Sequence, residues 1–174
     1  MITWILNALR FTEHWLREDH LSSVYIDQFR LVSRFSRSSR KGGGSGIFVR
    51  NFSCTKDVEY LKGLGSKNAF ELLSVELLDF NFILAYIYRF HDGDFYEFLH
   101  KLELEICKVQ TKGKHILLCG DWNISYLQRS VNYQNYKIPI QFANTMKSPT
   151  RIMHNTSSLT DVMITNNLIL KSKL

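Results

Sequence analysis

Two polar side chains, Asp121 and Asn123, follow the apolar run 116–119 and are the residues of this sequence best suited to chemistry. Side chains alternate between the two faces of an extended chain, so we expect Asp121 and Asn123 to share a face and Trp122 to point into the core. A carboxylate beside an amide can orient a water molecule and a phosphate oxygen together, and Gly120 lets the backbone approach a ligand closely. The same residues would also fit a strand that ends in a turn closed by the aspartate side chain, so both interpretations stay open.

The strand before Asp121 is expected to follow a helix over residues 94–109. Asp94 precedes Glu97 by three residues, as in a capping box, and apolar residues then recur at helical spacing. The runs 72–77 and 82–88 are predicted to pair as antiparallel strands, as are 29–35 and 47–49. Further strands are expected at 115–119 and 159–165, a strand or the end of a helix at 5–11, and a short helix at 138–146.

Length and composition predict one globular domain over residues 1–174. The chain is 45% hydrophobic and 13% aromatic, with only two prolines and no apolar run long enough to span a membrane. Its three cysteines lack the spacing of a metal site or a disulfide framework, which favours reduced thiols. We therefore expect an intracellular protein, in the nucleus or the cytoplasm, that is not secreted.

The net charge of +6 favours polyanionic partners, and the positive charge is concentrated in one part of the sequence. No acidic residue interrupts the stretch from Arg30 to Arg50, which also contains Arg34, Arg37, Arg40 and Lys41. Such a stretch can bind nucleic-acid phosphates without reading the base sequence. A solvated loop without a ligand is the alternative.

Several short segments, in their order along the chain, resemble the endonuclease/exonuclease/phosphatase superfamily. The resemblance is strongest to the apurinic-like endonuclease domain of non-LTR retrotransposons. It spans nearly the whole chain and depends on the order and spacing of its parts, because none is specific alone. The segments are Thr12-Glu13-His14-Trp15-Leu16, the glycine-rich stretch before Ile47-Phe48-Val49, Ile87-Tyr88-Arg89, Gly120-Asp121-Trp122-Asn123, Ser148-Pro149-Thr150-Arg151, Ser158-Leu159-Thr160-Asp161 and Ile164-Thr165-Asn166.

The resemblance implies an α+β fold, a four-layer αββα sandwich of two mixed sheets with the active site at one end. Glu13 would bind a divalent metal, Mg²⁺ or Mn²⁺, and Tyr88 would donate a hydrogen bond to the phosphate. Asp121 would orient or deprotonate the attacking water, Asn123 would hold a phosphate oxygen or the nucleophile, and Asp161 would orient the catalytic histidine of the family. DNA is the implied substrate and a fused reverse transcriptase the implied partner. The candidate DNA contacts are Arg34, Arg37, Arg40, Lys41, Arg89 and Arg151.

Each of these residues has a simpler interpretation when it is taken alone. Glu13 could be an acidic residue at the start of a helix, Tyr88 an aromatic residue at the edge of the core, and Asp161 a surface acid. Their joint occurrence in the family order favours the functional interpretation.

The sequence departs from the family pattern at both ends. No histidine follows Asp161, and no asparagine-bearing strand precedes Glu13 at the family spacing. We therefore expect a partial domain without its first and last strands, in which DNA hydrolysis is impaired or absent. The alternatives are a non-catalytic remnant that at most binds nucleic acid, and an esterase that acts on small phosphates or phosphoinositides.

Overall fold

The computed structural model describes only part of the chain. For residues 12, 18–19, 143–144, 151–153, 156–158 and 161–162 it describes the backbone but not the side chains. The described residues are 7–12, 16, 18–35, 44–61, 63–66, 69–123, 143–144, 151–153, 156–158 and 161–166.

The smaller sheet has three antiparallel strands in the order β1-β3-β2. These strands are β1 (Ala8–Thr12), β2 (Phe29–Phe35) and β3 (Ser45–Arg50), which confirms the predicted pairing of 29–35 with 47–49. The short helix α1 (Glu18–Ser22) lies on the outer face, where Leu21 is 2% exposed and reaches toward Gly46 of β3. Phe11 packs edge-on against Phe48 on this outer face, with ring centroids 5.6 Å apart.

The larger sheet has six strands in the order β4-β5-β6-β7-β11-β8. Its members are β4 (Thr55–Asp57), β5 (Phe70–Leu77), β6 (Phe82–Arg89), β7 (His115–Asp121), β8 (Ala143–Asn144) and β11 (Asp161–Thr165). β6 and β7 run parallel, while the other neighbouring pairs are antiparallel, including the predicted pair β5 and β6. Mixed sheets were expected in both layers; among the described strands, the larger sheet is mixed and the smaller sheet is antiparallel.

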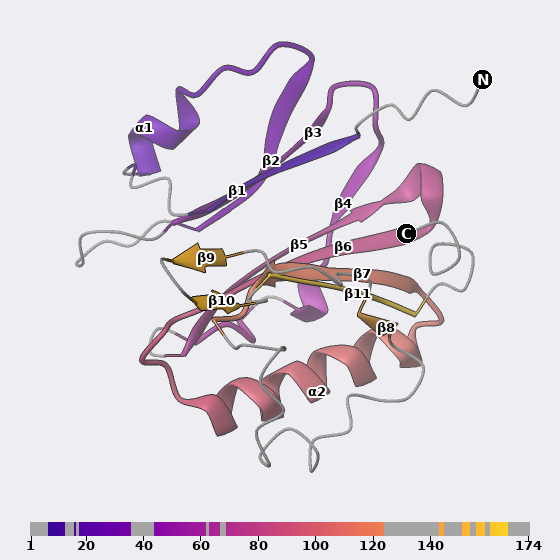
Figure 1. The fold of residues 1–174 in the computed structure, drawn as a ribbon. Helices are drawn as coiled ribbons and strands as arrows, with labels where there is room; N and C mark the ends of the chain where they lie inside the picture. Colours follow the sequence, from indigo (N-terminus) through magenta and orange to yellow (C-terminus); the bar gives the residue numbers. More distant parts are fainter. Residues whose placement is uncertain are drawn as a thin grey trace.

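Helix α2 (Phe95–Thr111) connects β6 to β7 and lies across the outer face of the larger sheet (Figure 1). The Asp94 side chain accepts a 2.8 Å hydrogen bond from the Glu97 backbone N–H, so the helix begins where the capping pattern predicts. Phe98, Leu102 and Ile106 are buried against the sheet, which anchors the crossover between the two parallel strands.

Large apolar clusters fill two of the three interfaces between the four layers of the sandwich. One cluster, between α2 and the larger sheet, includes Ile83 and Ile87 of β6 and Ile116 and Leu118 of β7. The other cluster lies between the two sheets. It includes Ile47 of β3, together with Tyr86 of β6 and Cys119 of β7, which are on the faces of these strands that point away from α2. β6 is therefore covered on both faces, as its doubly apolar pattern predicts, and the predicted αββα fold class is confirmed.

The remaining elements are short. The 3₁₀ turn η1 (Glu59–Leu61) follows the edge strand β4, and the 3₁₀ turn η2 (Leu78–Phe80) connects β5 to β6. β9 (Arg151–Met153) pairs with β10 (Thr156–Ser158) as a separate hairpin. The helix predicted at 138–146 is wrong for its described part, because residues 143–144 pair with β11 as a strand. Within the described ranges, no helix is long and apolar enough to cross a membrane.

Candidate active site

Three neighbouring strands place polar residues at one end of the larger sheet. Asp121, the last residue of β7, lies directly opposite Asp161, the first residue of the antiparallel strand β11. On the other side of β7 lies the parallel strand β6, in which Tyr86 is the register partner of Cys119 of β7. Tyr88 follows Tyr86 by two residues, just as Asp121 follows Cys119, so Tyr88 reaches the same end of the sheet on the same face.

The end of β1 reaches this place from the other sheet. Thr12 is the register partner of Ser45 in β3, and the Ser45 hydroxyl donates a 2.6 Å hydrogen bond to the Glu71 carboxylate in β5. Glu71 is in turn the register partner of Tyr88. Four contacting residues thus connect the end of β1 to the end of β6, and Figure 1 shows both strands ending on the side of the sandwich that carries the β9–β10 hairpin.

Gly120 allows β6 and β7 to approach closely beside Asp121. A Cβ atom at this position would lie 1.7 Å from the carbonyl oxygen of Ile87 in β6. A side chain here would require the backbone of one strand to move, because the obstructing atom is a main-chain oxygen. The close approach predicted for Gly120 therefore exists, but it is an approach between two strands of the protein.

The chain turns immediately after Asp121. The Asn123 N–H donates a 2.9 Å hydrogen bond to Oδ1 of Asp121, and Asn123 has the left-handed φ of 50°. Strand alternation consequently ends at Asp121, and the turn considered as the alternative is present. The Asn123 side chain donates a 2.7 Å hydrogen bond to the carbonyl oxygen of Arg89, so the ends of β6 and β7 are tied together. Trp122 points into the core as predicted, against Phe98 of α2, with ring centroids 5.3 Å apart.

The Arg89 side chain lies beneath the connection to α2. It is 7% exposed, donates a 2.7 Å hydrogen bond to the carbonyl oxygen of Gly93, and lies 5.7 Å from the centre of the Phe95 ring. Its burial gives the guanidinium group a role in the fold, in contrast to the surface DNA contact expected from the sequence. Its carbonyl oxygen, which holds Asn123, is the part of Arg89 that serves the site.

Glu71 and Arg10 are two charged residues near this end that the sequence interpretation did not include. Glu71 is fully buried and accepts hydrogen bonds from Ser45 and from the Gly44 N–H, the latter at 3.5 Å. Its signal in the sequence is position: in β5, Glu71 falls on the same alternating face as Leu73, Val75 and Leu77, all of which are buried. A charged residue on the buried face of a strand requires specific partners.

Arg10 extends from β1 into the space between the sheets. Its register partner is Ile47, a residue of the apolar layer between the sheets, and its guanidinium carbon lies 4.4 Å from the centre of the Tyr86 ring. Burial raises the pKa of the Cys119 thiol, and the positive charge and hydrogen bond of Arg10 act in the opposite direction. Arg10 therefore brings a positive charge to strands β6 and β7 two residues before Tyr88 and Asp121.

Comparison with solved structures assigns this architecture to a known fold. A mannosyl-6-phosphatase from Bacteroides thetaiotaomicron matches 91% of this chain and 70% of its own, with a TM-score of 0.58 and 16% identity. An endonuclease/exonuclease/phosphatase family protein from the same organism matches 85% of this chain and 62% of its own, with a TM-score of 0.55 and 16% identity. The endonuclease domain of TRAS1, a telomere-specific non-LTR retrotransposon, matches 80% of this chain and 67% of its own, with a TM-score of 0.54 and 11% identity.

The chain has the endonuclease/exonuclease/phosphatase fold. No protein-family model and no curated protein matches the sequence. The fold that the resemblance implied is thereby confirmed.

Within this fold, the structure brings together Tyr88, Asp121, Asn123 and the backbone of Asp161. Glu13, Arg37, Arg40 and Lys41 lie outside the described residues, although Glu13 directly follows the last residue of β1. Arg34 is exposed and donates a hydrogen bond to the Ser22 hydroxyl on the outer face of the smaller sheet. Arg151 begins β9, in the hairpin that lies two residues before β11 in sequence.

The donor groups at this end have the chemistry that a hard divalent cation prefers. Asp121 supplies carboxylate oxygens, and Mg²⁺ is bound in proteins through one or two carboxylates together with water and substrate phosphate. Among the described residues, no group of three or more histidine, cysteine, aspartate or glutamate side chains is arranged to hold a metal. A metal at this end would therefore need ligands from outside this described set, where Glu13 and the side chain of Asp161 lie.

Proposed function

We propose that this chain is a metal-dependent phosphodiesterase that cleaves DNA at the end of the sandwich where β6, β7 and β11 meet. The observation that carries the proposal is the register of these strands, which places Tyr88, Asp121 and Asp161 on three adjacent strands. A fold of this class has one member named as a phosphatase and another named as an endonuclease domain, so the fold accommodates hydrolysis of phosphate esters.

The described residues supply defined roles for such a reaction. The Asp121 carboxylate, held through Oδ1 by the Asn123 N–H, orients the attacking water and accepts its proton. The Tyr88 hydroxyl donates a hydrogen bond to a nonbridging phosphate oxygen. The Asn123 amide uses one N–H for the Arg89 carbonyl and can donate the other to the same phosphate.

A divalent cation, Mg²⁺ or Mn²⁺, completes the proposed site. Glu13 would hold it with carboxylate oxygens of the aspartate pair. When bound, such a cation neutralises the negative charge that develops on the phosphate and the leaving oxygen.

Charge favours DNA over a small phosphate ester as the substrate. The sequence carries a net charge of +6, and its basic stretch between Arg30 and Arg50 contains no acid. We assign phosphate contacts to Arg34, Arg37, Arg40, Lys41 and Arg151, which would position the duplex without reading its sequence. A reverse transcriptase fused in the same polyprotein is the partner that the retrotransposon resemblance implies.

Two other functions are supported by specific observations. The mannosyl-6-phosphatase match supports an esterase that acts on a small phosphate. The basic stretch between Arg30 and Arg50 supports a non-catalytic remnant that at most binds nucleic acid.

Nicking of supercoiled plasmid by purified protein in Mg²⁺ tests the proposal, with EDTA as the control and p-nitrophenyl phosphate as a parallel substrate. Slow metal-dependent nicking without hydrolysis of the small ester is the expected result. Hydrolysis of the small ester alone would favour the small-phosphate esterase. A folded protein that hydrolyses neither substrate would favour the remnant.

A further inference from the structure

Arg10 occupies an unusual position for an exposed cation. It points from β1 into the space between the sheets, and its guanidinium group covers the ring of Tyr86, which is itself 0% exposed. Its register partner Ile47 and its neighbour Ala8 belong to the apolar layer between the sheets. One side of the guanidinium group is therefore fixed on an aromatic ring while the residue remains accessible to solvent.

No acidic side chain among the described residues neutralises this charge. The ion pairs of Lys101 with Glu97 and of Lys114 with Glu76 both lie away from β1. The Cys119 thiol lies near Arg10 without neutralising its charge, because burial raises the pKa of the thiol and the thiol faces the carbonyl oxygen of Ala85. Stacking on a ring leaves the N–H groups at the guanidinium edge available to an anion.

The position of Arg10 relates it to the proposed active site. Tyr86 and Cys119 each precede a proposed site residue by two positions, a distance of about 6.6 Å along a strand. β1 ends at the same end of the sandwich as β6, as the Ser45–Glu71 hydrogen bond and Figure 1 show. An anion at the Arg10 guanidinium group would therefore lie about two residues along the strands, or about 6.6 Å, from a phosphate at Asp121.

We propose that Arg10 binds a backbone phosphate of the DNA substrate next to the phosphate that is cleaved. The assignment deepens the proposed function and rests on it, because it names a contact that distinguishes a polynucleotide from a single phosphate ester. The planar guanidinium group suits this role, since it can donate two parallel hydrogen bonds to a phosphate.

Binding of a fluorescein-labelled DNA duplex in EDTA tests the assignment without hydrolysis. Fluorescence anisotropy over a range of salt concentrations gives both the affinity and the number of phosphates neutralised. For Arg10→Gln we expect about tenfold to hundredfold weaker binding at low salt, because a charged hydrogen bond is lost. The slope of log affinity against log salt should become shallower by about 0.9, the value for one phosphate contact in duplex DNA.

Arg50→Gln is the matched control. Arg50 lies in the same sheet at the opposite end of β3 and also packs on aromatic rings, 5.2 Å from the centre of Phe29 and 5.9 Å from that of Phe52. Both glutamine variants lose a cation–π contact, so thermal melting should report similar stabilities. Only Arg10→Gln should change the salt slope, and Arg10→Lys should restore it, because lysine keeps the charge.

The outcomes separate this assignment from the proposed function. A shallower salt slope in Arg10→Gln would support the phosphate contact even if the parent protein does not nick plasmid, in which case only hydrolysis fails. An unchanged salt slope in Arg10→Gln would overturn the assignment, even if the parent protein nicks DNA. Failure of the parent protein to bind duplex at low salt would overturn it as well.

Discussion

Replacement of Glu105 should stabilise the protein at neutral and alkaline pH. Glu105 lies on the inner face of α2 between Leu102 and Val109 and is 1% exposed. Neither of its carboxylate oxygens has a hydrogen-bond partner among the residues that the structure describes. Burial raises its pKa from 4.5 to about 8, because the charged form loses its hydration and gains no compensating contact.

The sign of the pH effect follows from the difference in proton binding. In the unfolded chain the Glu105 carboxyl ionises near pH 4.5, whereas in the folded protein it keeps its proton up to about pH 8. Between these values the folded state binds more protons, so the free energy of unfolding falls as pH rises. The loss approaches about 1.4 kcal/mol for each pH unit in this window and totals on the order of 5 kcal/mol above pH 8. This is a large share of the about 5 to 15 kcal/mol that stabilises an ordinary domain.

Glu105→Leu removes the ionisable group and keeps a side chain of similar volume. Urea unfolding, followed by circular dichroism at several pH values from 5 to 8.5, should show the variant gaining stability over the parent as pH rises. Glu103→Gln, an exposed change on the same helix, is the control and should leave the pH dependence unchanged. A difference between Glu105→Leu and the parent that stays constant across this range would refute the reasoning.

Two further predictions concern the connection between β6 and β7. Gly120→Ala should lower the free energy of unfolding by about 3 kcal/mol or more in urea, because its Cβ would meet the Ile87 carbonyl at 1.7 Å. Gly113 has a φ of +62° and open space around a new Cβ, so Gly113→Ala should lower the free energy of unfolding by only about 1 kcal/mol. Equal losses of stability in Gly120→Ala and Gly113→Ala would contradict the packing argument. Asn123→Ala should lower the free energy of unfolding by about 2 kcal/mol, because the Arg89 carbonyl oxygen loses its hydrogen-bond donor. An unchanged free energy of unfolding would show that this hydrogen bond does not hold β6 and β7 together.

Local patterns in the sequence predicted the elements of the sandwich well. The capping pair of Asp94 and Glu97 and the apolar spacing behind it located α2, and the doubly apolar run of β6 indicated a strand covered on both faces. These features are encoded by residues close together in sequence. The same helical spacing also places Glu105 on the buried face, so this unusual carboxyl could have been found from the sequence.

The geometry of the site was less predictable because it depends on contacts between distant segments. The position of Arg10 over Tyr86 and the hydrogen bond from Ser45 to Glu71 both join the two sheets. No periodicity within a strand specifies how one sheet lies against another. The turn at Asn123 shows the local limit as well, since its sequence was compatible with an extended chain and with a turn.

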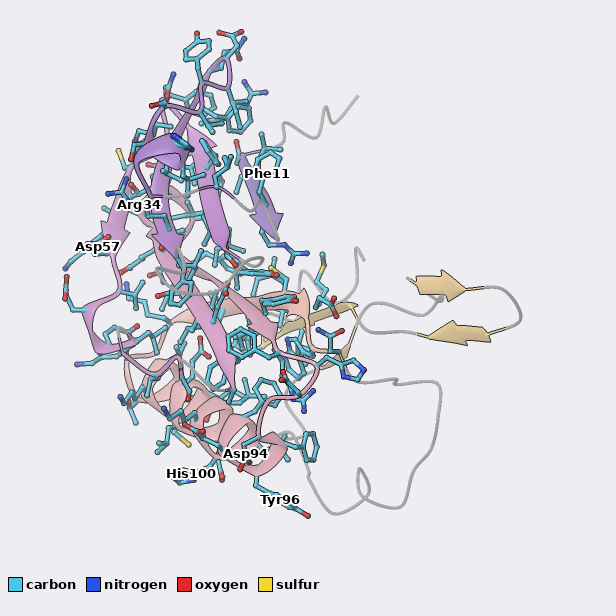
Figure 2. The ribbon with its side chains drawn as sticks, turned by 90° about the vertical axis from the view of Figure 1, so that its left-hand side faces the viewer. Phe11, Arg34, Asp57, Asp94, Tyr96 and His100 are labelled. Atoms are coloured by element: carbon cyan, nitrogen blue, oxygen red, sulfur yellow. The ribbon has the colours of Figure 1, made fainter. Side chains whose placement is uncertain are left out.

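The most direct test of the proposed site compares plasmid nicking by Asp121→Asn and Asp57→Asn in Mg²⁺. Asp57 is an exposed aspartate on β4, the edge strand opposite the β11 side of the sheet, and Figure 2 shows it far from the β9–β10 hairpin. We predict that Asp121→Asn lowers the initial rate by about a hundredfold or more and that Asp57→Asn changes it by less than about twofold, with both variants folded. Retention of the parent rate by Asp121→Asn, or no nicking by the folded parent protein, would contradict the proposed function.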